Sequence, residues 1–133
     1  MSIEANKAIV LRFNREFLEQ NNTEVLKEIV HTDFTNHTAP GTFPKNAEGL
    51  VGFIGMLHSG FSDITIEIHE MIGENDIVCT RKTIHAKHTG EIMGHAPTGK
   101  QVAMNVMDMV RIKDEQYIDH WGRNDVMQVI ASL

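Results

Sequence analysis

Apolar residues follow a helical period over the first part of the chain and a strand period over most of the rest. In residues 3–20 the apolar positions recur at steps of three and four, which is one stripe of an amphipathic helix that Ser2 can cap. Similar spacing predicts a short helix over residues 24–30 and a third over residues 47–61, which Asn46 can cap. Three helices are therefore expected before the first long strand.

After the third helix, the apolar period changes from about 3.6 residues to about 2. Residues 63–72 alternate isoleucine with polar side chains, as expected of a strand with one buried face. Three more strands are predicted over residues 77–89, 101–112 and 117–125, and the tail is expected to form a short helix or strand. Helices followed by strands with short turns predict an α+β domain, with a strongly curved antiparallel or mixed sheet and the helices on one side.

A long loop is predicted over residues 31–46, which hold two of the three prolines, with a short extended piece near residues 34–38. A loop of this length in a small domain is usually functional or mobile. We expect the curved sheet and the three helices to enclose a pocket.

Residues 94–101, GHAPTGKQ, have the glycine and lysine spacing of a phosphate-binding loop. Such a loop needs Ser or Thr after the lysine, and it runs from a strand into a helix whose amides hold the phosphates. Here Gln101 follows the lysine, Pro97 donates no amide, and the next residues alternate as a strand does. We interpret the segment as a connection between two strands, so no nucleotide site is predicted.

Length and composition indicate one globular domain over residues 1–133, with 41% apolar and 23% charged residues. The net charge of −6 argues against nucleic acid as a partner, because phosphate binding needs a basic face. No stretch approaches the roughly 20 apolar residues of a membrane span. The single cysteine, Cys79, suits a reducing compartment, so a cytoplasmic location is expected.

Several of the eight histidines invite a metal site, but their spacing does not support one. His85 and His88 lie three apart in a predicted strand and point to opposite faces, so they cannot bind the same ion. The chain has no HExxH motif and no Cys/His pattern of a zinc site. Neither a metal nor another cofactor is predicted.

Asp108 is the clearest candidate for chemistry, because it interrupts a strongly apolar strand and shares a face with Val106 and Val110. If that face is concave, the carboxylate lies in an apolar cavity with a raised pKa and becomes a candidate general acid or base. The alternatives are that it pairs with a cation, Arg81 or Lys82, or faces water.

The last predicted strand, YIDHWGRND, offers polar and aromatic side chains on both faces. Trp121, the only tryptophan, belongs either to the core or to the wall of a pocket. His120 lies on the opposite face of the same strand.

Three segments, HTDFTNHT, HTGEIMGHAPTGK and HWGRND, occur in this order. With them the chain resembles the SnoaL-like polyketide cyclases, or predicted ester cyclases, of the nuclear-transport-factor-2-like superfamily, over nearly its whole length. The resemblance implies a cone-shaped α+β barrel, a deep apolar pocket between sheet and helices, and a homodimer packed through the sheets.

The family's cyclases close polyketide esters by an intramolecular aldol reaction without metal or cofactor. Their aspartate acts as acid and base, with a histidine and an asparagine nearby. The resemblance matches the asparagine to Asn36 and the loop histidine to His88. It puts the pocket histidine at Asp108 and the catalytic aspartate at Gly122, so the residue type has changed at both positions.

Two functions follow, and a third role is weaker. One is a cofactor-free cyclase or isomerase-like enzyme for a small apolar carbonyl compound, in which Asp108 moves the proton and Asn36 or His120 stabilises the enolate. The other is a protein of the same fold that binds a small hydrophobic molecule without chemistry; the third is a dimerisation scaffold. The catalytic candidates are Asp108 and His120, and the ligand-binding candidates are Asn36, His88, Trp121 and Arg81.

Overall fold

Five strands form one mixed sheet in this computed structural model, which describes residues 2–133. Their order across the sheet is β1-β5-β4-β3-β2, with β1 parallel to β5 and all other neighbours antiparallel. The sheet is open, since its outer strands β1 and β2 do not pair with each other, so it is not a closed barrel. The strands are β1 (Val30–Asn36), β2 (Phe61–Glu74), β3 (Ile77–His88), β4 (Gln101–Lys113) and β5 (Gln116–Asn124).

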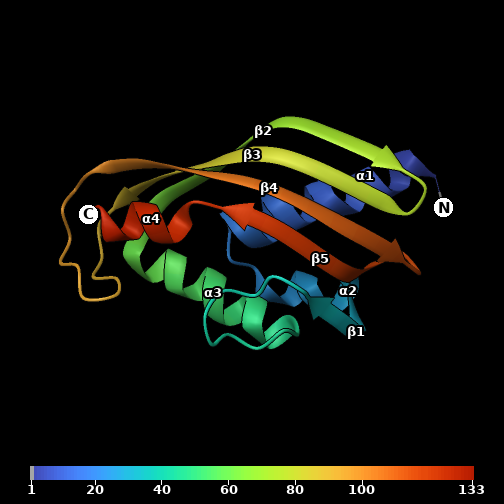
Figure 1. The fold of residues 1–133 in the computed structure, drawn as a ribbon, viewed down its shortest axis with the longest axis horizontal. Coiled ribbons are helices and arrows are strands. Elements are labelled where there is room, and N and C mark those ends of the chain that lie inside the picture. The colour runs from blue at the N-terminus through green and yellow to red at the C-terminus, as the bar shows by residue number, and fades with distance from the viewer. Residues whose placement is uncertain (1) are drawn as a thin grey trace.

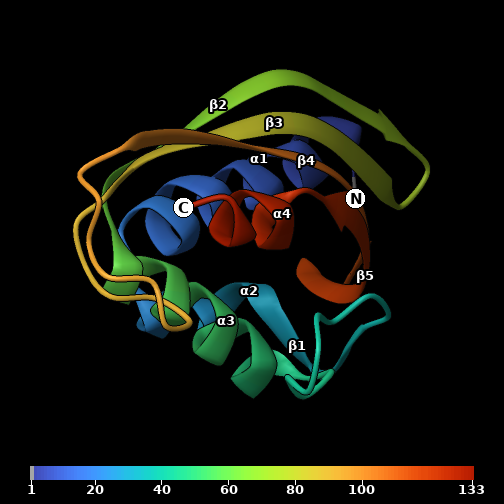
Figure 2. The ribbon, with the colours of Figure 1, turned by 60° about the vertical axis from the view of Figure 1, so that its left-hand side comes forward.

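The helices lie on the concave side of this sheet (Figure 1). In Figure 2 the strands β2, β3 and β4 arch over α1 and α4, and α3 lies below both. The α+β class is therefore confirmed. The helical segments are α1 (Ile3–Arg12), a π-helix η1 (Phe13–Glu19), a 3-10 turn η2 (Thr23–Val25), α2 (Leu26–Ile29), α3 (Ala47–Gly60) and α4 (Val126–Ala131).

Side-chain caps set the starts of the two longer helices. Ser2 Oγ accepts a hydrogen bond from the Ala5 amide at 3.0 Å, and Asn46 Oδ1 accepts from the Gly49 amide at 3.3 Å. Both caps were predicted from the sequence, since short polar side chains satisfy amides that the first turn leaves without partners.

Burial alternates along the strands and defines two faces. On β4, Met104 and Val110 face the core, with at most 1% of their surface exposed, while Met107 on the opposite face is 62% exposed. The concave face packs on the helices through one apolar cluster, which includes Val10, Phe17, Ile54, Leu57, Ile84 and Tyr117.

The loop predicted over residues 31–46 is wrong for residues 31–36, because Val30–Asn36 form strand β1, and the extended piece predicted near residues 34–38 lies partly in this strand. This strand is short and lies at the sheet edge, parallel to β5, with Thr35 opposite Asp119 and Asn36 opposite His120. Pairing with a strand more than 80 residues away leaves little local signal. It brings Asn36 beside His120.

The segment between β3 and β4 connects two strands, as predicted, and β4 begins directly after it. The His88 amide donates to the Lys100 carbonyl and the Gly99 amide to the His88 carbonyl, both at 2.8 Å, so the ends of the connection are held together. No helix within residues 2–133 is long and apolar enough to cross a membrane.

Candidate functional site

Five polar side chains form a row inside the curved sheet. Lys82 Nζ donates to Asn14 Oδ1 at 2.7 Å and lies 3.2 Å from Asp108 Oδ2. The same carboxylate oxygen lies 3.6 Å from His120 Nε2, and His120 Nδ1 is 2.9 Å from Asn36 Oδ1. The row thus crosses the interior from η1 through β3, β4 and β5 to β1.

Strand register and alternation bring these groups together. Asp108 pairs across β4 and β5 with Gly122, which is two residues from His120 and therefore on the same face. On the other side Asp108 pairs with Thr80, which is two residues from Lys82. Diagonal neighbours on one face of a sheet are within reach of long side chains. Asp108 therefore lies on the concave side of the sheet, which is the condition that the sequence left open.

The expectation of a raised pKa for Asp108 is wrong. Burial is the largest influence and raises the pKa, but the ammonium of Lys82 and the hydrogen bond and charge of His120 together outweigh it. The pKa of Asp108 therefore lies below its ordinary value of 3.8, and the group is an ionised carboxylate at neutral pH. Of the two cations considered from the sequence, Lys82 is the partner.

His120 lies between two acceptors. The Asn36 Oδ1 that faces its Nδ1 also accepts the Thr38 amide at 3.2 Å, which supports this orientation of the Asn36 side chain. The imidazole therefore donates its Nδ1 proton to Asn36 and turns Nε2 towards the carboxylate of Asp108.

A cavity of about 90 Å³ adjoins the row and is lined by Asn36, Lys82, Asp108 and His120. Its other walls are largely apolar and come from η1, α3 and the strands; they include Phe13, Leu50, Phe53, Ile54, Leu57 and Val106. Pockets for drug-sized ligands measure roughly 300–1,000 Å³. This cavity is therefore smaller than a typical ligand pocket.

Gly122 belongs to the same site, although it has no side chain to offer. A Cβ atom at this position would lie 3.0 Å from His120 Cε1 and 3.5 Å from Asp108 Cβ. The Gly122 amide donates to Thr38 Oγ1 at 2.8 Å, which ties β5 to the segment after β1. A side chain at position 122 would therefore project between His120 and Asp108, and its absence leaves room for them.

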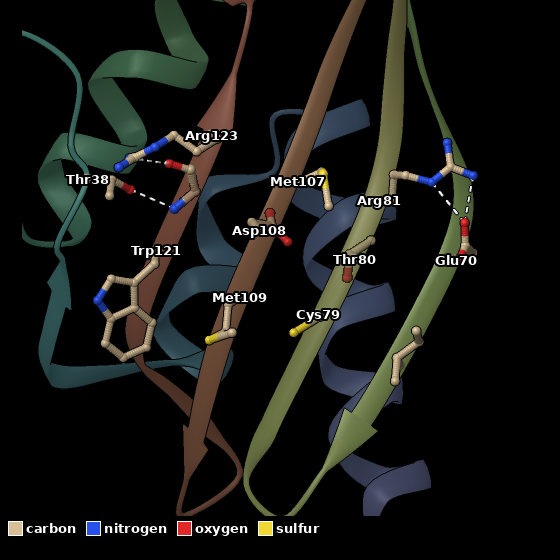
Figure 3. Close-up of a pocket in the computed structure, with 12 residues that line it drawn as sticks. Thr38, Glu70, Cys79, Thr80, Arg81, Met107, Asp108, Met109, Trp121 and Arg123 are labelled. Carbon is tan, nitrogen blue, oxygen red and sulfur yellow. Dashed lines mark hydrogen bonds and ion pairs between the residues drawn. The ribbon is translucent and has the colours of Figure 1, made fainter.

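Three predicted ligand-binding residues do not line the cavity. His88 is fully buried at the end of β3, where its Nδ1 accepts the Thr98 amide at 3.2 Å and lies 2.9 Å from Thr98 Oγ1. Trp121 and Arg81 lie on the outer face of the sheet (Figure 3). The row unites Asp108, His120 and Asn36, and the other three candidates lie apart from it.

Each outer-face candidate has its own contacts. The Trp121 ring stacks on His37 at 4.7 Å between centroids, with the planes 7° apart. Arg81 donates from Nε to Glu70 Oε1 at 2.9 Å, which Figure 3 marks with dashed lines. Neither side chain reaches the interior from this face, because successive residues of a strand point to opposite sides.

Lys82 and Asn14 also belong to the row. From the sequence, Lys82 was considered only as a possible partner of Asp108, and Asn14 was not predicted. The signal for Lys82 was its inward position in the alternation Val78, Thr80, Lys82, Ile84, where a buried cation needs a carboxylate. Asn14 similarly interrupts the apolar stripe of the first helix beside Phe13 and Phe17. Within residues 2–133, no group of three or more His, Cys, Asp or Glu side chains is arranged to hold a metal ion.

Comparison with known proteins identifies the family. The sequence model for SnoaL-like polyketide cyclases matches residues 8–133. The chain belongs to this family. No curated protein matches the chain.

Solved structures with the same fold include other SnoaL-like proteins. IdmH from Streptomyces antibioticus, provisionally named a polyketide cyclase, is 25% identical with a TM-score of 0.81, over 95% of this chain and 96% of that one. A protein of Acidithiobacillus ferrooxidans with the same provisional name is 24% identical with a TM-score of 0.83, over 100% and 97%. AclR from Streptomyces galilaeus, provisionally named a hydroxylase, is 21% identical with a TM-score of 0.85, over 99% and 84%. The provisional names differ, so the shared fold does not fix the reaction.

Proposed function

We propose that the cavity is a cofactor-free acid/base site for a small, uncharged carbonyl compound. His120 accepts a proton from the substrate and returns it, and Asp108 is the negative charge beside the imidazole. The observation that supports this assignment is the ionised Asp108 carboxylate, 3.6 Å from His120 Nε2 at the wall of an apolar cavity. The role of proton carrier thus moves from Asp108 to His120, because a carboxylate with a lowered pKa is a weak base.

The proposed step is removal of a proton next to a carbonyl group. The C–H bond breaks, its proton moves to His120 Nε2, and the electron pair shifts onto the carbonyl oxygen to form an enolate. Asn36 supports the enolate through its Nδ2, which makes no hydrogen bond within residues 2–133. In a ring closure, the enolate carbon attacks a second carbonyl group, and His120 returns the proton to the new alkoxide.

Charge and size set the class of substrate. Lys82 and Asp108 neutralise each other, and the remaining walls are mostly apolar, so an uncharged molecule fits better than an ion. The volume of about 90 Å³ favours a short β-keto ester or a similar compound over a polycyclic one.

Deuterium exchange at the carbon between the carbonyl groups of ethyl acetoacetate, followed by proton NMR, tests this proposal. His120→Gln is expected to reduce the enzyme-catalysed rate by about 100-fold or more, the usual contribution of a general acid or base. The matched control is His85→Gln, a histidine on the outer face of β3 with 47% of its side chain exposed, which should exchange at the wild-type rate. Wild-type exchange in the His120 variant would refute the assignment.

A second candidate is a protein that binds a small hydrophobic molecule without catalysing a reaction. It is favoured by Gly122, which stands where the family has its catalytic aspartate, and by the ion pair that weakens Asp108 as a base. Titration of the wild-type protein with ethyl acetoacetate distinguishes the two. Chemical-shift changes at the cavity residues with exchange no faster than in buffer would support binding alone.

We also propose that two copies associate through the outer face of the sheet. Ile72 and Met107 are each 62% exposed there, and Met109 is 42% exposed. They border a hollow of about 560 Å³ together with Trp121 (Figure 3). An exposed apolar patch of this kind marks an association surface.

A second copy fits this face because the face carries both signs of charge, Glu70 beside Arg81 and Arg123, and a twofold interface must be self-complementary. Met107→Glu is expected to convert a dimer to a monomer in analytical ultracentrifugation without loss of helix signal. A wild-type monomer at high concentration would exclude the dimer.

The lone thiol, Cys79, supports a cytoplasmic location.

A further inference from the structure

We propose that Lys82, held in place by Asn14, is the positioning residue that keeps Asp108 ionised and directed at His120. The sequence motifs that indicate the family assign no role to Lys82 or Asn14. The polar partners of Lys82 within residues 2–133 are Asn14 and Asp108, so its influence on His120 passes through the carboxylate. The effect of Lys82 on catalysis rests on the proposed function. The ionisation of Asp108 can be measured whether or not that function is correct.

The first support is the way in which the ammonium is fixed. Lys82 is 3% exposed, and its Nζ donates to Asn14 Oδ1 at 2.7 Å. Asn14, which is 1% exposed, in turn donates from Nδ2 to the Val10 carbonyl at 2.9 Å, so its oxygen can point only at the lysine. A flexible side chain is thereby held at one point beside Asp108.

The second support is the local helix geometry. Asn14 lies in η1, where seven residues continue α1 with the wider π-helical turn. Such segments are rare and occur often at functional sites. The segment sets the Asn14 side chain towards the sheet, opposite the inward-facing side of β3.

The third support is the set of charged and titratable groups around Asp108. Lys82 reaches it from β3 and His120 from β5, and the buried Tyr117 on β5 is close enough for Asp108 to raise the pKa of its phenol, after burial itself. The ammonium of Lys82 lies nearer to the carboxylate, at 3.2 Å, than His120 Nε2, at 3.6 Å. Without it, burial would favour the protonated acid, and His120 would lose its negative partner.

Carbon-13 NMR of the Asp108 carboxyl group tests the inference directly. In the wild-type protein the group should stay ionised down to the acid limit of the folded state. In Lys82→Met its midpoint should rise by about one pH unit or more, as expected when a nearby opposite charge is removed. Lys82→Arg keeps the charge and should restore most of the low midpoint. Asp119, a carboxylate on the outer face of β5, serves as the internal control that does not move.

Asn14→Leu provides a second test that retains the ammonium. It should raise the Asp108 midpoint by less than Lys82→Met, and it decides the question if the lysine variant does not fold. An unchanged Asp108 midpoint in the folded Lys82→Met protein, or in Asn14→Leu if only that variant folds, would overturn the inference. A raised midpoint in Lys82→Met, together with a wild-type protein that does not catalyse exchange, would retain the positioning role and reject the catalytic one.

Discussion

The two faces of the central strands present the same chemistry under opposite conditions. Arg81 and Lys82 are adjacent on β3, and each pairs with one carboxylate, but they point to opposite sides of the sheet. The outer pair, Arg81 with Glu70, has side chains that are 50% and 57% exposed. The inner pair, Lys82 with Asp108, has side chains that are 3% and 9% exposed.

The two pairs differ in whether water can solvate the charge that remains when one partner is removed. On the outer face, each charge keeps most of its hydration when its partner is lost. On the inner face, loss of one partner leaves a buried charge without compensation. The inner pair therefore constrains which residues can be changed one at a time, whereas the outer pair does not.

The largest expected effect follows from breaking the inner pair on one side. Asp108→Leu leaves Lys82 buried without a counter-charge and should lower the free energy of unfolding by about 3–5 kcal/mol. The double variant Lys82→Met and Asp108→Leu removes both charges and should recover most of that loss. Urea unfolding of the three proteins measures the difference. If Asp108→Leu lowered the free energy of unfolding by less than about 1 kcal/mol, well below this range, water would have to reach the inner face.

The second largest effect is expected from acid, which should reduce the contribution of the inner pair to the free energy of unfolding. The pKa of Asp108 in the folded protein lies below its ordinary value of 3.8, so the unfolded chain takes up a proton at a higher pH than the folded one. The stability that Asp108 contributes is thus present above 3.8 and is lost as the pH falls through the lower folded pKa. Unfolding free energies measured towards acid pH should fall less steeply in the double variant than in wild type. Parallel curves would contradict the lowered pKa.

A methyl group at Gly122 should have an intermediate effect on the inner face. Its Cβ would lie 3.0 Å from His120 Cε1, so the ring must move by a few tenths of an ångström. We expect Gly122→Ala to cost about 1–3 kcal/mol, as other insertions into packed sites do, and to slow deuterium exchange. Thermal unfolding and the exchange assay measure the two effects. Unchanged values in both would mean that the cavity has more room than the contacts indicate.

The inner face could be predicted in part from the sequence, because alternation is a local property. Asp108 interrupts a run of apolar residues with period two, and this marked it as a candidate without deciding whether its face is concave. The same argument applied to β3 would have placed Lys82 opposite it. The resemblance to the family located Asn36, but its position beside His120 depends on the parallel pairing of β1 with β5.

Other features depend on contacts between distant segments and left no readable pattern. The π-helical turn at Phe13–Glu19 has the same apolar spacing as an ordinary helix. The lowered pKa of Asp108 reverses the prediction from burial, because two charges from neighbouring strands outweigh desolvation. Cavity size is likewise a sum over side chains from many elements.

The smallest expected effect lies on the outer face and completes the comparison. Glu70→Gln removes the partner of Arg81, but both side chains are at least half exposed, so the free energy of unfolding should change by less than about 1 kcal/mol. Urea unfolding at two protein concentrations measures it, with Asp108→Asn as the matched change from carboxylate to amide on the inner face. A larger loss that grows with protein concentration would place Glu70 within the interface between two copies, where its partner is no longer replaceable by water. A larger loss independent of concentration would contradict the distinction between the faces, because exposure would then not decide what an ion pair contributes.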